Sequence, residues 1–310
     1  MTDIINENLN EISKKRKKVE YNGMEFLCAL LCLYSNLSLD NLFEYTTRLS
    51  NQIWCENTQF YIDDLILKKA LIHNYIQHFK LPIELDTIEQ VYVTGKKSHH
   101  PDIISLNKGL DRKMTKADVY IKLKNGIFIG ISVKESVYAV KTNFSVQKIL
   151  NNKEIIDNLN RIKQTLLTEH GYPTHNKEKR NEVNQLFYPI DPSTPMNPYW
   201  KQLKDEIEIK KKEIIEEIVK PMFSYHLPYT MYEYDGVHFT CLNFNELKFD
   251  QITFEHHLPY YYDSKGILRK CAKLFYQLKV FNKIYRVEIR WKGNIHCASP
   301  QFLVHYDSMV

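Results

Sequence analysis

Three polar residues stand at the ends of two short apolar runs, where their side chains could bind a metal ion and activate water. Asp118 begins the first run, and Ser132 and Lys134 close the second, in the stretch ADVYIKLKNGIFIGISVKES. A carboxylate and an ammonium that meet where two strands end could hold a divalent cation and offset negative charge on a substrate. The alternative is an Asp–Lys pair on a solvated sheet face, which contributes about 0–1 kcal/mol.

Alternating apolar residues on either side of Asn125-Gly126 predict a β-hairpin. A two-residue turn would place apolar residues opposite polar ones all along this hairpin. A three-residue loop at 124–126 instead pairs residue 119 with residue 131, so that apolar residues share one face. Because a one-residue slip exchanges the two faces of a strand, the apolar pattern selects the three-residue loop.

This register determines which polar side chains meet. Asp118 falls opposite Ser132, and Lys134 follows one position further along the same face. Tyr120 falls opposite Gly130, which leaves room at the centre of that face. The hairpin therefore predicts a site at the strand ends.

The remaining elements predict an α/β protein with a helical front and a β-rich C-terminal part. Helical patterns cover about 4–19, 23–36, 39–51, 60–79, 145–168 and 199–220. A strand is expected at 88–93, a proline-rich loop at 171–198 and several antiparallel strands after 230. We expect a catalytic core at 1–170 and a recognition or dimerisation part at 171–310, which could also form one continuous domain.

Composition narrows the function. The chain has 310 residues and a formal charge of +5, which permits a nucleic-acid partner without requiring one. Only nine glycines are present and none form a GxG spacing, so the phosphate cradles of nucleotide-binding loops are not expected. The polar N-terminus and the absence of an apolar run near eighteen residues predict a cytoplasmic protein without a membrane segment.

Asp118, followed on the next strand by Ser132-Val133-Lys134, resembles the signature of the PD-(D/E)xK nucleases, and the surrounding residues look like those of type II restriction endonucleases. The resemblance covers about residues 20–160. It implies a restriction-endonuclease-like mixed sheet flanked by helices, and Mg²⁺-dependent, sequence-specific cleavage of double-stranded DNA. It also implies a homodimer, since twofold symmetry suits the cutting of two antiparallel strands.

The resemblance implies that Asp118 and the carbonyl of Val133 bind Mg²⁺, and that Lys134 orients or deprotonates water. Ser132 stands where the family usually has Asp or Glu, so another acid must supply the missing charge. Glu154, on the helix after the hairpin, is the first choice. Glu25, beside a stripe of small residues on the second helical segment, is the next.

Other residues complete these expectations. Asp102, in HHPD, matches the letters of the signature but lies in a polar stretch far upstream. Contacts to DNA are expected from side chains that follow the catalytic strand or lie in the tail: Lys141, Asn143, Gln147, Lys148, Arg286, Arg290 and Lys292.

Two other functions remain open. One is a ββα-metal nuclease that uses the adjacent His256 and His257, although the sequence lacks the usual helix downstream of them. The other is a DNA-binding or repair-type protein of the same fold that lost catalysis with the acid at Ser132. A cleavage assay with Mg²⁺ separates the three functions.

Overall fold

The computed structural model describes most of the chain. The described residues are 21–47, 51–84, 87–94, 100–110, 115, 117–136, 139–189, 196–224, 227–243, 252–257, 260–262, 268–270, 272–280 and 283–307. The helix expected at 4–19 lies outside these residues.

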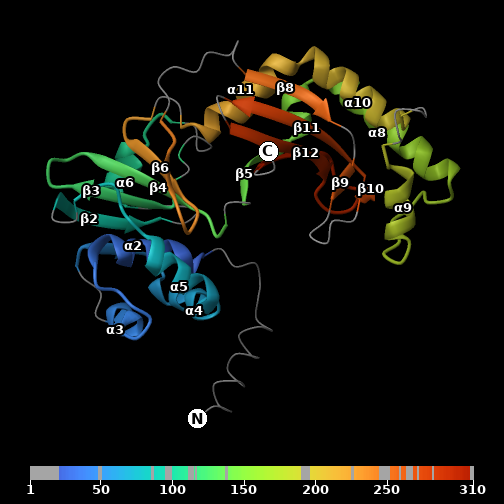
Figure 1. Ribbon diagram of the computed structural model, residues 1–310. Coiled ribbons are helices and arrows are strands. Elements are labelled where there is room, and N and C mark those ends of the chain that lie inside the picture. The colour runs from blue at the N-terminus through green and yellow to red at the C-terminus, as the bar shows by residue number, and fades with distance from the viewer. Residues whose placement is uncertain are drawn as a thin grey trace, which may run out of the picture. The chain divides into compact units, whose positions relative to one another are not determined.

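The chain divides into two compact units, each built around its own sheet (Figure 1). Unit 1 comprises residues 1–137 and 226–243, and unit 2 comprises 138–225 and 244–310. This division differs from the boundary expected near residue 170. The physical reason is strand pairing. The strand at 140–145 pairs within the C-terminal sheet, and the strand at 230–234 pairs within the first sheet.

Unit 1 contains a mixed six-stranded sheet in the order β1-β2-β3-β4-β6-β7. Its strands are β1 (Ile53–Cys55), β2 (Ile88–Val93), β3 (Val119–Leu123), β4 (Phe128–Val133), β6 (Thr230–Tyr234) and β7 (Phe239–Cys241). The β1–β2 and β4–β6 pairs are parallel, and the others are antiparallel. The β6–β7 hairpin turns at Asp235-Gly236, as its sequence predicts.

Helices cover both faces of this sheet. The helices of unit 1 are α2 (Gly23–Leu33), α3 (Leu42–Thr47), α4 (Thr58–Ile66), α5 (Lys69–His78) and α6 (Pro101–Leu106). Buried side chains of α2, α4 and α5 pack with Val119, Ile131 and Val133 on one face. On the other face Ile103 of α6 packs with Tyr120. The strand alternation thus separates two cores on the two faces of the sheet.

Unit 2 contains an antiparallel five-stranded sheet in the order β5-β13-β12-β11-β8. Its strands are β5 (Val140–Ser145), β8 (Ile252–His257), β11 (Lys273–Val280), β12 (Lys283–Trp291) and β13 (Pro300–Tyr306), and β9 (Tyr260–Tyr262) and β10 (Leu268–Lys270) form a separate pair. Helices lie along one side of this sheet (Figure 1): α7 (Val146–Leu150), α8 (Lys153–Glu169), α9 (Arg180–Leu186), α10 (Pro198–Ile209) and α11 (Lys211–Met222). The mixed architecture confirms the α/β class with a β-rich C-terminal part.

Two long helical patterns are interrupted. The segment expected to be one helix at 145–168 ends a strand and then forms α7 and α8, with Asn151 in a left-handed conformation at φ 38° between them. The side chain of Asn152 caps α8 by accepting from two amides. The helix expected at 199–220 breaks at Lys210 into α10 and α11, and the proline-rich loop contains α9.

Candidate functional site

The β3–β4 hairpin has the register that its apolar pattern predicts. Val119 lies opposite Ile131, and the strands are joined by the three-residue loop 124–126. Gly126 adopts φ 82°, a left-handed conformation that glycine reaches without steric cost from a Cβ. The prediction of a three-residue loop is therefore confirmed.

Backbone and side-chain hydrogen bonds both fix Asp118 at the end of this hairpin. Its amide donates to the carbonyl of Ile131 at 2.8 Å. Its Oδ2 accepts from the amide of Val133 at 2.8 Å and from the hydroxyl of Ser132 at 3.3 Å. Ser132 is only 2% exposed. The serine hydroxyl therefore orients the aspartate carboxylate and adds no charge of its own.

Lys134 directly follows β4, and its backbone is held from two sides. Its amide donates to the carbonyl of Tyr234 at 2.7 Å, and its carbonyl accepts from the hydroxyl of Tyr75. The side chain is half-buried. No ion pair joins its ammonium to another described residue. The backbone of Lys134 is thus held in place, and its ammonium is accessible to a ligand.

Glu25 lies in the first turn of α2 and belongs electrostatically to the same site. Its residue is 9% exposed, and its buried Oε2 has no hydrogen-bond partner among the described residues. Burial raises the pKa of this carboxyl well above its usual value, and the negative charge of Asp118 raises it further. The positive charges of Lys134 and Lys68 lower it. A helix acid and a strand acid therefore share one electrostatic environment.

Close packing between α2 and α4 determines where Glu25 lies. A Cβ on Gly23 would be 2.4 Å from the backbone nitrogen of Leu65, so this approach requires glycine. The amide of Gly23 also donates to Oδ2 of Asp64 at 2.8 Å. The N-terminus of α2 is thus fixed against α4 by both shape and a charge-assisted hydrogen bond.

Lys68 is a candidate residue that the sequence did not point to. Its ammonium pairs with Asp64 at 2.6 Å, donates to Oδ1 of Asn22 at 2.8 Å and pairs with Glu135 just beyond Lys134. In the sequence, Asp64 and Lys68 look like an ordinary i,i+4 surface pair. The burial of Asp64 and the contacts of Lys68 depend on helix packing, which local spacing does not reveal.

Glu154, the first choice for the additional acid, lies in unit 2 at the start of α8. Its side chain is exposed, and its amide donates to Oδ1 of Asn152 at 3.0 Å. Within unit 1, the negative charge of Asp118 acts on Glu25. Glu154 and Asp118 belong to different units, so both choices stay predictions.

Asp102 has a structural environment of its own on the α6 side of the sheet. Its Oδ2 accepts from the hydroxyl of Tyr92 at 2.7 Å and lies 3.7 Å from the ammonium of Lys122. The bond from Tyr92 holds the pKa of this carboxyl below its usual value. Asp102 thus stabilises the packing of α6 against the sheet.

The arrangement fits a divalent cation that is bound largely by oxygen atoms. Glu25 and Asp118 provide two carboxylates, and the unpartnered Oε2 of Glu25 is a buried acceptor that a cation would satisfy. In the described part of the chain no three His, Cys, Asp or Glu residues group as metal ligands. Backbone oxygens, water and a phosphate would therefore complete the coordination, as Mg²⁺ commonly permits.

In unit 2 the expected DNA-contacting residues from two distant segments meet on one sheet face. The register aligns Asn143 with Leu303 and Leu303 with Glu288, so β5, β13 and β12 present these side chains together. We call this surface the basic face. Its members are Asn143, Lys273, Arg286, Glu288 and Arg290, and Lys141 lies nearby at the β-bulge where the pairing of β5 with β13 shifts.

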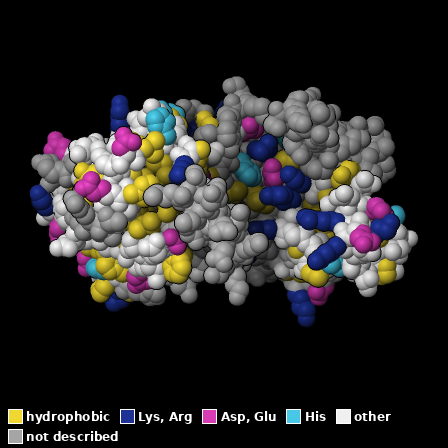
Figure 2. All heavy atoms as spheres, turned by 90° about the horizontal axis from the view of Figure 1, so that it is seen from below, with side chains coloured by type: hydrophobic (Ala, Val, Ile, Leu, Met, Phe, Trp, Pro, Cys, Tyr) yellow, Lys and Arg dark blue, Asp and Glu magenta, His cyan; other side chains and the backbone are white. Residues whose placement is uncertain are grey.

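One buried acid organises the cations of the basic face. Glu288, 7% exposed, pairs with Lys273 at 3.1 Å, with Arg286 at 3.6 Å and with Arg290 at 3.5 Å. The Nε atoms of both arginines are buried without a hydrogen-bond partner among the described residues. Figure 2 shows Lys and Arg side chains gathered over this part of the molecule. Three cations around one carboxylate leave a net positive surface.

The other expected DNA contacts have different positions. Lys148 on α7 pairs with Glu217 of α11, on the helical side of the sheet. Gln147 is exposed in the first turn of α7, and Lys292 is exposed just after β12. Lys148 is therefore engaged within the protein, whereas Gln147 and Lys292 remain accessible.

His256 and His257 are consecutive residues of β8 and so point to opposite faces of the sheet. His256 lies over Tyr276, with ring centroids 5.3 Å apart, and burial lowers its pKa to about 4. His257 is exposed. This geometry does not support a shared metal site at the two histidines.

Comparisons with protein-family models, with curated proteins and with solved structures find no match. None of the helices in the described ranges is both long enough and apolar enough to cross a membrane. The features that point to a function are therefore the residues of the β3–β4 hairpin, their geometry and their short signature.

Proposed function

We propose that the protein is a Mg²⁺-dependent, site-specific endonuclease of the type II restriction class that acts on double-stranded DNA. The observation that carries this proposal is the grouping of Glu25, Asp118 and Lys134 around the end of the β3–β4 hairpin. Two carboxylates with a nearby ammonium are the groups that metal-assisted phosphodiester hydrolysis requires.

In this proposal Asp118, Glu25 and the carbonyl of Val133 hold Mg²⁺, which supplies Lewis-acid stabilisation of the phosphate. Asp118 is held in place by its bonds from Ser132 and Val133. Lys134 orients the attacking water and offsets the negative charge that develops on the phosphate. Each of these side chains acts from a backbone position that hydrogen bonds fix.

The basic face supplies the DNA contacts in this proposal. Arginine can bind guanine edges bidentately, and lysine commonly contacts phosphate. Arg286 and Arg290 share Glu288, which holds their guanidinium groups in place before any ligand binds. Two copies of the chain, related by a twofold axis, would cut both strands of a symmetric sequence.

The test compares two acids under metal titration. Cleavage of supercoiled plasmid DNA is measured against Mg²⁺ concentration for Glu25→Gln, Glu154→Gln and the unchanged protein. We expect Glu25→Gln to require at least tenfold more Mg²⁺ and to recover partly in Mn²⁺, because one carboxylate ligand is lost. Glu154→Gln is the matched control, since it removes one exposed acid from unit 2.

Two results would contradict the proposed reaction, and a third would remove Glu25 from the site. Cleavage that persists in EDTA would exclude the metal-dependent reaction. DNA binding without any cleavage in Mg²⁺ or Mn²⁺ would instead favour the DNA-binding protein that lost catalysis, because Ser132 lacks the charge of the usual acid. An unchanged metal dependence in Glu25→Gln would show that another acid completes the site.

A further inference from the structure

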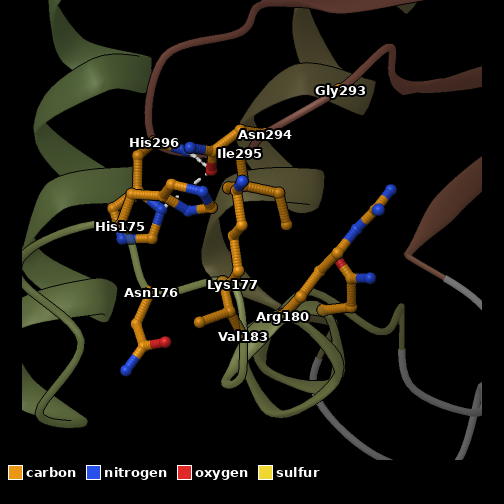
Figure 3. Close-up of a pocket in the computed structure, with 10 residues that line it drawn as sticks. His175, Asn176, Lys177, Arg180, Val183, Gly293, Asn294, Ile295 and His296 are labelled. Carbon is orange, nitrogen blue, oxygen red and sulfur yellow. Dashed lines mark hydrogen bonds between the residues drawn. The ribbon is translucent and has the colours of Figure 1, made fainter.

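A separate pocket of about 300 Å³ lies within unit 2, in the size range of small-ligand sites (Figure 3). One wall is the segment that leads into α9, and the other is the turn between β12 and β13. Its polar lining residues include His175, Asn176, Lys177, Arg180, Asn294 and His296. These residues belong to neither the Glu25–Asp118 site nor the basic face.

A hydrogen-bonded histidine joins the two walls. His296 Nε2 lies 3.0 Å from the carbonyl oxygen of Tyr172, and its Nδ1 lies 3.0 Å from Oδ1 of Asn294. The amide of His296 also donates to Oδ1 of Asn294 at 3.0 Å. Because the ring contacts both segments, the walls keep their positions without a ligand.

The lining carries positive charge without a compensating acid. Lys177 and Arg180 line the pocket, and no Asp or Glu does. Neither side chain forms an ion pair with any residue that the structure describes. Figure 3 shows both extending toward the turn that carries Gly293 and His296. The nearby Glu182 is already bound by Lys179 at 2.9 Å and by the hydroxyl of Tyr172.

Hydrogen-bond donors accompany these charges. Oδ1 of Asn176 accepts from the amide of Glu178 at 2.9 Å, so its amide nitrogen is left as a donor. The guanidinium of Arg180 offers a planar set of donors that matches two oxygens of one tetrahedral anion. Lys177 adds three donors on a flexible stem. Lys177 and Arg180 thus offer charges and donors complementary to a phosphate, whereas the Asn176 amide points away from them (Figure 3).

We propose that this pocket binds the phosphate group of a phosphorylated ligand, with Lys177 and Arg180 as its charged contacts. The phosphate belongs either to a free nucleotide-sized molecule or to a nucleic-acid strand that crosses unit 2. This inference does not require nuclease activity, because the pocket and the Glu25–Asp118 site share no residue.

Isothermal titration calorimetry of the full chain in EDTA tests the proposal with three probes. These are inorganic phosphate, a nucleoside 5′-monophosphate and a short single-stranded oligonucleotide without a terminal phosphate. We expect Lys177→Gln and Arg180→Gln each to weaken binding of the preferred probe by about tenfold, because each removes a charge-assisted hydrogen bond. Tighter binding of the monophosphate identifies a free ligand, and tighter binding of the oligonucleotide identifies a strand.

Matched controls separate the pocket from general attraction of anions. Lys179→Gln removes the same charge two residues from Lys177 but outside the lining, and Arg161→Gln does so on the exposed surface of α8. Both should bind within about twofold of the unchanged protein. Equal weakening in the controls, or no binding of any probe at millimolar concentration, would overturn the proposal. Since all four side chains are exposed, none of these variants should unfold the chain.

Discussion

The carboxylate of Asp118 accepts the backbone amide of Val133 at 2.8 Å, and this bond ends the pairing of β3 with β4. The side-chain oxygen accepts the hydrogen bond that a backbone carbonyl would accept in a regular strand pair. Asp118 therefore has two roles, because the same carboxylate completes the hairpin and contributes negative charge to the environment of Glu25. Substitutions can separate these roles.

Asp118→Asn should abolish cleavage and change stability little, because asparagine keeps an oxygen acceptor for Val133 but loses the charge that binds a cation. Asp118→Ala should also lower the free energy of unfolding by about 1–3 kcal/mol, since the buried amide loses its partner. Urea unfolding and plasmid cleavage measure the two effects. Ser132→Ala is the control and should cost less, because its bond to Asp118 is longer at 3.3 Å. Equal activity of Asp118→Asn and the unchanged protein would remove Asp118 from the site.

Glu25 should make the stability of the protein depend on pH. Its folded pKa lies well above the usual 4.5, so between these values the folded state binds more protons than the unfolded state. Stability is then greatest below pH 4.5 and falls as pH rises through the folded pKa. In EDTA, Glu25→Gln should become more stable than the unchanged protein once the pH exceeds that folded pKa, since it removes a buried charge whose Oε2 has no hydrogen-bond partner among the described residues.

Mg²⁺ should make the unchanged protein more stable than Glu25→Gln, because the cation binds the ionised carboxylate of Glu25. Differential scanning fluorimetry at pH 8 should show a Tm that rises with Mg²⁺ in the unchanged protein and much less in Glu25→Gln. Glu154→Gln serves as the control and should follow the unchanged protein. Identical Mg²⁺ responses in all three proteins would show that Glu25 binds no cation.

Lys134→Met should lower cleavage at least a hundredfold and leave DNA binding within about threefold. The ammonium acts on water and phosphate at the reacting centre, whereas most of the DNA contacts are expected on the basic face. Single-turnover cleavage and a gel-shift titration measure the two quantities. Lys124→Met, in the exposed loop of the same hairpin, removes an equal charge and should leave both unchanged. Near-normal turnover in Lys134→Met would mean that another group activates the water.

Arg286→Gln should weaken DNA binding and reduce its dependence on salt, because the substitution removes one cation of the basic face. A lost phosphate contact lowers the slope of log affinity against log salt by about 1. Lys148→Gln is the charge-matched control and should have a much smaller effect, because Lys148 pairs with Glu217 on the helical side of the sheet. Fluorescence anisotropy measures the DNA affinity between about 50 and 200 mM salt, where counterion release has a pronounced effect. The same slope in all three proteins would place DNA elsewhere.

Local pattern determined the hairpin and its polar end. Side chains alternate strictly along a strand, so the apolar residues around Val119 and Ile131 admitted only one register, and Asp118 had to meet Ser132. The α/β class followed from the same periodicities. The sequence also placed Glu25 on a helix beside small residues, but it did not rank this acid above Glu154.

Tertiary packing decided what local pattern could not. Gly23 lets α2 approach α4 closely, and burial in this packing raises the pKa of the Glu25 carboxyl. Lys68 and the basic face likewise depend on contacts between residues far apart in the sequence. Helical and strand periodicities specify which face of an element is apolar, but they do not specify its neighbour. The neighbour sets the burial and charge around each acid, and these decide which acids can form a metal site.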